Sequence, residues 1–258
     1  MVNLKKYKVL FQNFGLFLTL LVVFSCNSHK MTVTKVEGKL ININKTNNEN
    51  KEVEDYIKPY REKIDADLNA VLAIAPQTLD KSGLWQSTIG NLLADVTLQK
   101  GNVVFNKREN KSIDICLLNF GGIRAIINKG EVTARTAFEI MPFENSLIVV
   151  ALNGTQILEI VDYLIITKKA QPLSGITFTI SKSKVAKNIL VQGKPVEPDK
   201  IYYVATSDYL SNGGDNMIFF KNGSQFFDLN YKLRNILIDY FKDVDSIPLI
   251  NDIRITAE

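Results

Sequence analysis

The sequence predicts an α+β fold, in which helices and antiparallel hairpins are mixed irregularly along the chain. Helix-period apolar patterns occur at residues 52–75, 133–139, 154–167 and 231–244. Strand-like apolar runs occur at residues 113–118, 146–152, 175–180, 189–192, 201–206 and 253–256. Because these segments do not alternate as repeated strand–helix–strand units, the pattern favours α+β over a doubly wound parallel sheet.

Length and composition are those of a globular chain. The 258 residues include 46% hydrophobic and 22% charged side chains, enough for one large domain or two small ones. The formal net charge is +4, but three lysines precede Cys26, and the chain from Cys26 onward carries only +1. No basic stripe stands out, so we expect no nucleic-acid polymer as a partner.

The start of the chain predicts a lipoprotein signal peptide over residues 1–25. A basic segment precedes the apolar run 16–24, which is too short to cross a bilayer comfortably as a helix. The run ends in Val-Phe-Ser-Cys, which resembles the site at which a bacterial lipoprotein is cleaved and acylated, here on Cys26. A plain secretory peptide is the alternative. We expect an extracytoplasmic protein that is anchored to a bacterial membrane by lipid. Cys116, in an apolar run, is then a small buried side chain without a disulfide partner.

Residues 26–51 are predicted to form a tether that is partly ordered. Residues 32–36 and 39–43 are expected to pair as short strands around Gly38, and the polar run 45–51 is typical of a loop.

Residues 52–258 are assigned to a single domain that begins with a helix. Apolar residues recur at spacings of three and four over residues 52–75, and Pro59 predicts a kink or a second helix start within them. We expect this apolar stripe to pack in the core.

A glycine-rich motif follows the predicted strand at 113–118: Asn119, Phe120, Gly121, Gly122, Ile123 and Arg124. Glycines permit close backbone approach and dihedral angles that other residues avoid. Asn119 offers both a donor and an acceptor, and Arg124 offers a rigid fork of donors for a planar anionic group. Considered alone, a glycine pair is more often a tight turn with a solvated arginine.

Two further motifs change this interpretation. Residues 207–215 read Ser-Asp-Tyr-Leu-Ser-Asn-Gly-Gly-Asp after a predicted strand, and residues 141–145 read Met-Pro-Phe-Glu-Asn. The three motifs together resemble those of the C-terminal, substrate-binding domain of 5′-nucleotidases: Asn-x-Gly-Gly-Ile-Arg, Pro-Phe-x-Asn and aromatic-Leu-x-x-Gly-Gly-Asp. The resemblance covers about residues 52–258, and it implies a layered α/β/β/α sandwich in which helices flank two packed sheets.

The resemblance also implies roles for individual residues. Phe143 and Tyr209 would stack on the two faces of a nucleobase, although Phe143 alone would more often be a core residue. Asp215 would accept hydrogen bonds from ribose hydroxyls, while Asn119 and Arg124 would face the base and the phosphate. The remaining substrate-binding residues implied are Gly121, Gly122, Asn212, Gly213 and Gly214.

One segment departs from the family pattern. Residues 90–95, Gly-Asn-Leu-Leu-Ala-Asp, resemble the helix that packs beside the substrate cleft. Upstream of it the family usually has a glutamate and often an arginine, whereas this chain has Gln86 and no arginine. The departure calls into question part of the contact expected on the phosphate side.

The sequence offers no catalytic set of its own. In the family, hydrolysis is performed by an N-terminal domain that holds two metal ions with His, Asp and Asn ligands, and this chain has a single histidine, His29. It also has no phosphate-cradling loop and no cysteine spacing typical of a metal site. We therefore expect no cofactor in this chain, with divalent metal ions only in a separate metallophosphatase partner.

Three functions remain open from the sequence. The leading hypothesis is the nucleotide- or nucleoside-recognition domain of a split 5′-nucleotidase, acting in extracytoplasmic nucleotide breakdown. The first alternative is a non-catalytic, surface-anchored nucleoside-binding or interaction lipoprotein. The second alternative is a domain that hydrolyses phosphoesters by itself.

Overall fold

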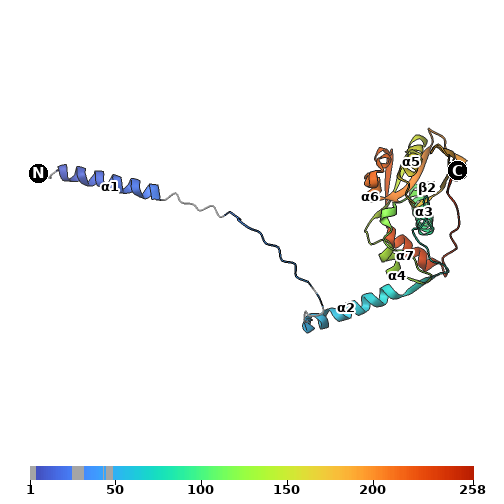
Figure 1. The fold of residues 1–258 in the computed structure, drawn as a ribbon, viewed down its shortest axis with the longest axis horizontal. Helices are drawn as coiled ribbons and strands as arrows, with labels where there is room; N and C mark the ends of the chain where they lie inside the picture. The colour runs from blue at the N-terminus through green and yellow to red at the C-terminus, as the bar shows by residue number, and fades with distance from the viewer. Residues whose placement is uncertain (1–3, 25–31, 43, 45–48) are drawn as a thin grey trace. The chain divides into compact units, whose positions relative to one another are not determined.

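The structure, a computed structural model, describes residues 4–24, 32–42, 44 and 49–258 (Figure 1). The helices are α1 (Leu4–Phe24), α2 (Lys51–Asn69), α3 (Thr88–Glu109), α4 (Ala134–Ile140), α5 (Gly154–Thr167), α6 (Asp208–Ser211) and α7 (Leu233–Asp243). Short 3-10 turns are η1 (Phe120–Gly122), η2 (Gly214–Asn216) and η3 (Ile218–Asn222). The strands are β1 (Val71–Ala75), β2 (Ile115–Leu117), β3 (Gly130–Thr133), β4 (Ser146–Asn153), β5 (Leu173–Ser174), β6 (Ile176–Ile180), β7 (Ala186–Val191), β8 (Lys194–Pro195), β9 (Ile201–Ser207), β10 (Gln225–Lys232) and β11 (Ile255–Ala257). The chain divides into two compact units, Met1–Lys51 and Glu52–Glu258.

The first unit contains α1 and an extended segment. Within the described ranges, no helix combines the length and the apolar character that crossing a membrane requires. The prediction of paired strands at 32–36 and 39–43 is wrong for the described part, because residues 32–42 form neither helix nor strand and are exposed. A two-stranded hairpin with no further strand or helix to cover it is marginal in water. Ile43, Cys26 and most of the predicted loop at 45–51 lie outside the described residues.

The second unit is built around a five-stranded sheet with the order β10-β4-β9-β2-β5. Strand β4 is antiparallel to both of its neighbours, and β2 runs parallel to β9. Both faces of β4 are covered: Leu147 and Val149 belong to one hydrophobic cluster, and Ile148 and Val150 belong to the other. This double burial explains the uninterrupted apolar run of the strand.

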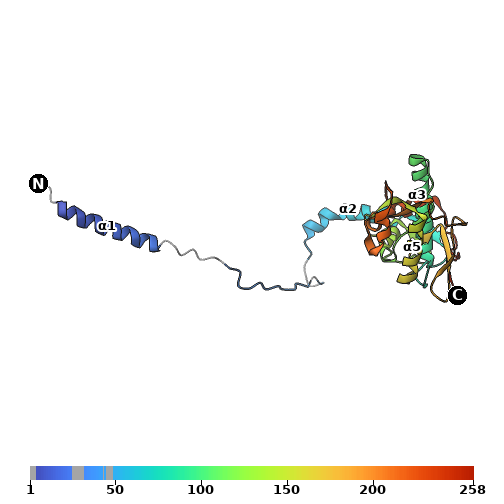
Figure 2. The ribbon, with the colours of Figure 1, turned by 90° about the horizontal axis from the view of Figure 1, so that it is seen from above.

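Helices and a second sheet cover the two faces. One cluster joins the five-stranded sheet to α3, α4 and α7, and the other joins it to α5 and to the four-stranded sheet β11-β6-β7-β8. Figure 1 shows α5 on one side of β2 and α3, α7 and α4 on the other. Seen from above, the axes of α3 and α5 run in similar directions (Figure 2). The predicted α+β class, with helices flanking packed sheets, is confirmed.

Most predicted elements are present, with their ends shifted by a few residues. The predicted helices at 133–139, 154–167 and 231–244 correspond to α4, α5 and α7, and the predicted strands correspond to β2, β4, β6, β7, β9 and β11. Asn153 caps α5 as expected, because its side chain accepts a hydrogen bond from the Gln156 backbone N–H at 3.0 Å. Cys116 is fully buried, and this burial raises the pKa of its thiol.

The predicted helix at 52–75 needs two corrections. It ends at Asn69, and Val71–Ala75 forms β1, which pairs antiparallel with β3. The expectation that its apolar stripe packs in the core is also wrong, because no residue of α2 is buried. Arg135 holds the C-terminal end of α2, donating to Asp65 at 2.7 Å and to Asn69 at 2.8 Å. An amphipathic pattern thus marks a helix here without marking a buried one.

Candidate functional site

The topology brings the three sequence motifs to one edge of the five-stranded sheet. Strands β2 and β9 are parallel, so the residues that follow them leave the sheet at the same edge. Strand β4 is antiparallel to β9, and Leu147 at its start lies opposite Ser207 at the end of β9. The loop before β4, which carries the Met-Pro-Phe-Glu-Asn motif, therefore lies at the same edge of the sheet as the other two motifs.

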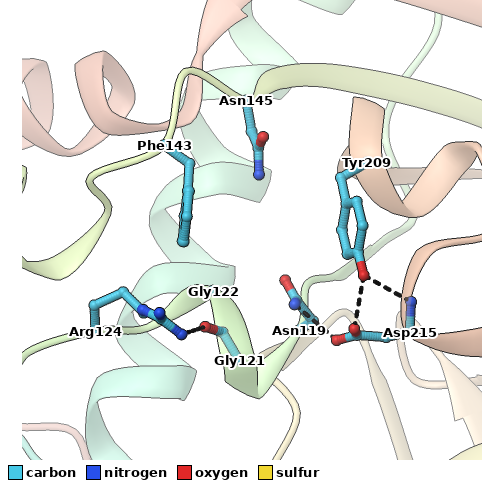
Figure 3. A pocket seen from close by; sticks show the side chains of 8 residues that line it. All are labelled: Asn119, Gly121, Gly122, Arg124, Phe143, Asn145, Tyr209 and Asp215. Carbon is cyan, nitrogen blue, oxygen red and sulfur yellow. Dashed lines mark hydrogen bonds between the residues drawn. The ribbon is translucent and has the colours of Figure 1, made fainter. Parts of the chain in front are cut away.

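A cavity of about 290 Å³ lies at this edge (Figure 3). It is lined by seven of the predicted residues, together with one asparagine: Asn119, Gly121, Gly122, Arg124, Phe143, Tyr209, Asp215 and Asn145. The predicted residues Asn212, Gly213 and Gly214 line an adjoining depression with Asp208 and Tyr209. Tyr209 is thus the side chain that the two hollows share.

Close packing around Asn119 explains the glycine pair that follows it. A Cβ atom on Gly122 would lie 2.8 Å from the Asn119 Oδ1 atom, closer than side chains tolerate. The Asn119 Nδ2 atom in turn donates to the Asp215 Oδ2 atom at 2.7 Å. Positive φ is not involved, because neither Gly121 nor Gly122 has it, so the expectation of special dihedral angles is wrong there. It holds in the third motif, where φ of Gly213 is 83°.

The backbone of the first motif is fixed from outside the motif. The Phe120 backbone N–H donates to the Gln171 Oε1 atom at 2.6 Å, and Gln171 is only 3% exposed. The Arg124 backbone N–H donates to the carbonyl of Ile140, at the end of α4, at 2.8 Å. Sequence reasoning missed Gln171, because an isolated glutamine in a loop carries no pattern that reveals its partner.

Phe143 and Asn145 are positioned by the start of α7. The Leu233 backbone N–H donates to the Asn145 carbonyl at 3.0 Å. The Lys232 Nζ atom donates to the Glu144 carbonyl at 2.7 Å. These bonds secure the backbone of the loop while leaving the side chain of Phe143 outside the core.

Two aromatic rings stand exposed on opposite sides of the cavity. Phe143 is 41% exposed and Tyr209 is 47% exposed, so the core-packing alternative for Phe143 is wrong. In Figure 3 the side chain of Asn145 points into the space between the two rings. The arrangement offers two flat apolar faces and an amide, which together suit a planar heterocycle.

A positively charged side chain, Arg124, lies close to the Phe143 ring. The Arg124 guanidinium lies 5.4 Å from the centroid of that ring, and its Nη1 atom donates to the Gly121 carbonyl at 3.3 Å. Among the residues that the structure describes, no carboxylate forms an ion pair with Arg124. Its charge is therefore available to an anionic ligand.

Lys81 adds to this charge, although no sequence motif contains it. Its Nζ atom donates to the Ile123 carbonyl at 2.8 Å and lies 3.8 Å from the centroid of the Phe120 ring. Partial burial, and then the neighbouring charge of Arg124, lower the pKa of Lys81. A second cation, Lys81, therefore contacts the glycine-rich motif.

Asp215 is held by side chains from three parts of the chain. Its Oδ2 atom accepts from Asn119, and its Oδ1 atom accepts from the Tyr209 hydroxyl at 3.0 Å. Its backbone carbonyl accepts from the Tyr163 hydroxyl at 2.9 Å. Burial, together with the charge of Asp215, raises the pKa of Tyr163, so this phenol stays protonated as a donor. Tyr163 lies on α5, and its role was not predicted.

Gln86 does not reach the cavity. Its Oε1 atom accepts from the backbone N–H groups of Arg254, at 2.7 Å, and Ile255, at 3.1 Å, and so holds the start of β11. The Arg254 side chain bonds Asp95 at 2.5 Å and Asp252 at 2.6 Å. Gln86 and Asp95, in the segment whose phosphate-side contact the sequence had called into question, thus bond the last segment of the chain.

The residues that the structure describes do not form a cluster of side chains suited to a metal ion. Among these residues, no group of three or more His, Cys, Asp or Glu side chains is placed to hold a metal ion. His29 lies outside the described residues.

Comparison with known proteins agrees with this geometry. Residues 68–222 match the family described as 5′-nucleotidase, C-terminal domain, which is more than half of the chain. A 5′-nucleotidase of Vibrio vulnificus is 28% identical over 172 residues, covering 62% of this chain and 29% of that protein. The trifunctional nucleotide phosphoesterase YfkN of Bacillus subtilis is 30% identical over 171 residues, covering 61% of this chain and 11% of that protein.

The same architecture is present in solved structures. A 5′-nucleotidase precursor from Thermus thermophilus superimposes with a TM-score of 0.67 at 24% identity, over 80% of this chain and 43% of that one. The NAD nucleotidase of Haemophilus influenzae gives a TM-score of 0.61 at 16% identity, over 81% and 42%. At these identities the likeness concerns the fold alone. The chain spans less than half the length of each of these four proteins.

Proposed function

We propose that this chain, which belongs to the 5′-nucleotidase C-terminal domain family, is the nucleotide- or nucleoside-recognition part of a split 5′-nucleotidase. The observation that carries the proposal is the pair of exposed rings, Phe143 and Tyr209, on opposite sides of one cavity. Large apolar side chains that are exposed to solvent at the wall of a cavity are typical of a ligand-binding site and not of core packing. A nucleobase, with two π faces, matches a gap that has an aromatic ring on each side.

The polar groups of the cavity suit the rest of a nucleotide. Asn145 lies where it can read the edge of the base, with one donor and one acceptor. Asp215 presents a carboxylate that can accept from the ribose hydroxyls. On the opposite side, Arg124, supported by the nearby charge of Lys81, suits a phosphate group.

Hydrolysis belongs, in this proposal, to a separate metallophosphatase chain that brings divalent metal ions. The support is the matched family itself, which is described as a C-terminal domain of 5′-nucleotidases. This chain would supply binding and orientation, which raise the rate of a reaction performed by groups on the other chain.

We place this activity outside the cytoplasm, in nucleotide breakdown. The predicted signal peptide and the predicted lipid on Cys26 support an extracytoplasmic chain tethered to a bacterial membrane. Nucleotides released there would meet a recognition domain held near the membrane surface.

A phosphate-release assay tests the split-enzyme proposal. The chain from residue 26, with Cys26→Ser, is given AMP with Mn²⁺, Zn²⁺ or Mg²⁺, first alone and then with a metallophosphatase domain from the same organism. We expect no metal-dependent turnover alone and turnover with the partner. Arg124→Ala or Asp215→Ala should then lower kcat/KM by at least about 10-fold, since a lost charge-assisted contact costs about 1.5–3 kcal/mol.

The matched control is Arg135→Ala, which removes an arginine that contacts α2 and not the cavity. Sustained turnover by the purified chain alone would contradict the proposal and favour a self-sufficient hydrolase. Nucleoside binding with no activating partner would favour a non-catalytic binding lipoprotein instead.

A further inference from the structure

The Tyr209 hydroxyl makes two hydrogen bonds to a single residue. It donates to the Asp215 Oδ1 atom at 3.0 Å, and it accepts from the Asp215 backbone N–H at 3.2 Å. The ring itself lies close against the backbone, because a Cβ atom on Gly214 would approach the Tyr209 Cε1 and Cζ atoms to 2.5 Å. Tyr209 is therefore hydrogen-bonded to Asp215, the residue that faces the ribose in the proposed binding mode.

These contacts fix the carboxylate from two sides. The Asn119 amide donates to the Oδ2 atom at 2.7 Å, while Tyr209 donates to the Oδ1 atom. The backbone of Asp215 has the left-handed conformation, with φ 51° and ψ 27°, and Tyr163 secures its carbonyl. Each carboxylate oxygen can accept a second hydrogen bond, and Asp215 is exposed at the cavity. Two oxygens, each with one remaining site, match a pair of neighbouring hydroxyls.

We propose that the Tyr209 hydroxyl is a positioning group that holds the Asp215 carboxylate ready for the vicinal diol of a ribonucleoside. This inference rests on the proposed function, since it assigns a sugar preference to the same cavity. The ring of Tyr209 binds the base, and its hydroxyl makes the site selective for sugars that carry both the 2′- and the 3′-hydroxyl.

The physical basis is preorganisation. An exposed carboxylate on a flexible loop must lose rotational freedom when it accepts two hydrogen bonds from a sugar, and this ordering weakens binding. In this site Tyr209 and Asn119 already hold the Asp215 carboxylate in one orientation before a ligand binds. Removing the hydroxyl returns that freedom, and it also leaves the Asp215 backbone N–H without its partner.

Deleting the Tyr209 hydroxyl would change ribonucleoside affinity in the opposite direction under a second physical account, and this difference defines the test. If the hydroxyl merely occupied a position that the sugar needs, the sugar would have to displace it. Deleting the hydroxyl would then strengthen the binding of a ribonucleoside. The two accounts differ in the direction of the change, so one substitution separates them.

The experiment compares adenosine with 2′,3′-dideoxyadenosine by calorimetry on the full chain in detergent. Tyr209→Phe keeps the stacking ring and removes the hydroxyl alone. We expect it to weaken adenosine binding about 5- to 10-fold, the effect of losing roughly one hydrogen bond, while dideoxyadenosine changes less than about 2-fold. The preference for adenosine over the dideoxynucleoside therefore falls.

Tyr231→Phe is the control, because it removes a hydroxyl that bonds the Asp239 carboxylate and does not line the cavity. Any effect of this control should change both affinities by the same factor and leave the preference intact. Tighter adenosine binding by Tyr209→Phe, or an equal change for both ligands, would overturn the inference while leaving the proposed function standing. Failure of the unaltered chain to bind either nucleoside would overturn both.

Discussion

At the scale of single residues, the cavity depends on an exposed ring whose backbone is anchored. The loop that carries Phe143 is bonded to the start of α7 through the Asn145 carbonyl, so the ring is presented at a fixed place. Exposure of so large an apolar side chain costs hydrophobic stabilisation unless a ligand covers it. The main effect of the ring is therefore expected in binding, not in folding.

Replacing Phe143 with alanine should weaken adenosine binding by roughly 5- to 150-fold. Base–aromatic stacking contributes about 1–3 kcal/mol per base, which corresponds to this range of affinity. Calorimetric titration of the variant measures the change. Phe226→Ala is a matched control, since Phe226 is a half-exposed phenylalanine on β10 that does not line the cavity. Unchanged adenosine affinity in a folded Phe143→Ala variant would remove the stacking assignment.

The residues that line the cavity could be predicted because they belong to three motifs that resemble those of a known family. Those that support them could not be predicted. Lys81, Gln171 and Tyr163 act through contacts with Ile123, Phe120 and Asp215, respectively, and each pair is separated by more than forty residues. Only the packing of distant elements creates these contacts, so no local pattern in the sequence marks them.

At the scale of elements, the end of the chain is secured by Gln86, the side chain at which the sequence departs from the family pattern. Gln86 accepts hydrogen bonds from two successive backbone N–H groups of the segment that leads into β11. Strand β11 pairs with β6 along only three residues, from Ile255 to Ala257. So short a strand relies on additional anchors.

Gln86→Leu should therefore destabilise the domain by about 1–3 kcal/mol, because two backbone donors lose their acceptor. Urea unfolding measures this change, and hydrogen exchange at residues 253–257 should quicken. Gln86→Glu keeps an acceptor oxygen and should retain most of the stability. An unfolding midpoint in Gln86→Leu equal to that of the unaltered chain would show that β11 does not depend on this contact.

The spacing of apolar residues predicted most elements, but it did not predict which of them are buried or where each strand lies in a sheet. The apolar stripe of α2 has the spacing of a core helix, yet no residue of this helix is fully buried. Strand β10 was not predicted, although apolar and polar residues alternate from Phe227 to Lys232, which is the pattern of a half-buried strand. Its position at the sheet edge comes from pairing with β4, a contact that sequence period alone does not encode.

At the scale of the whole molecule, the site is a consequence of sheet topology. The parallel pairing of β2 with β9 and the antiparallel pairing of β9 with β4 place three separate motifs at one edge. Two hydrophobic clusters, one on each face, hold that sheet in place. The α+β class could be predicted from the order of segments, whereas the strand order that creates the cavity could not.

The most direct test of the central claim is a crystal structure of the chain with adenosine. The account predicts the adenine ring between Phe143 and Tyr209, with the ribose diol within hydrogen-bond distance of the Asp215 carboxylate. An empty cavity in crystals grown with saturating adenosine, or a nucleoside bound elsewhere on the domain, would contradict it.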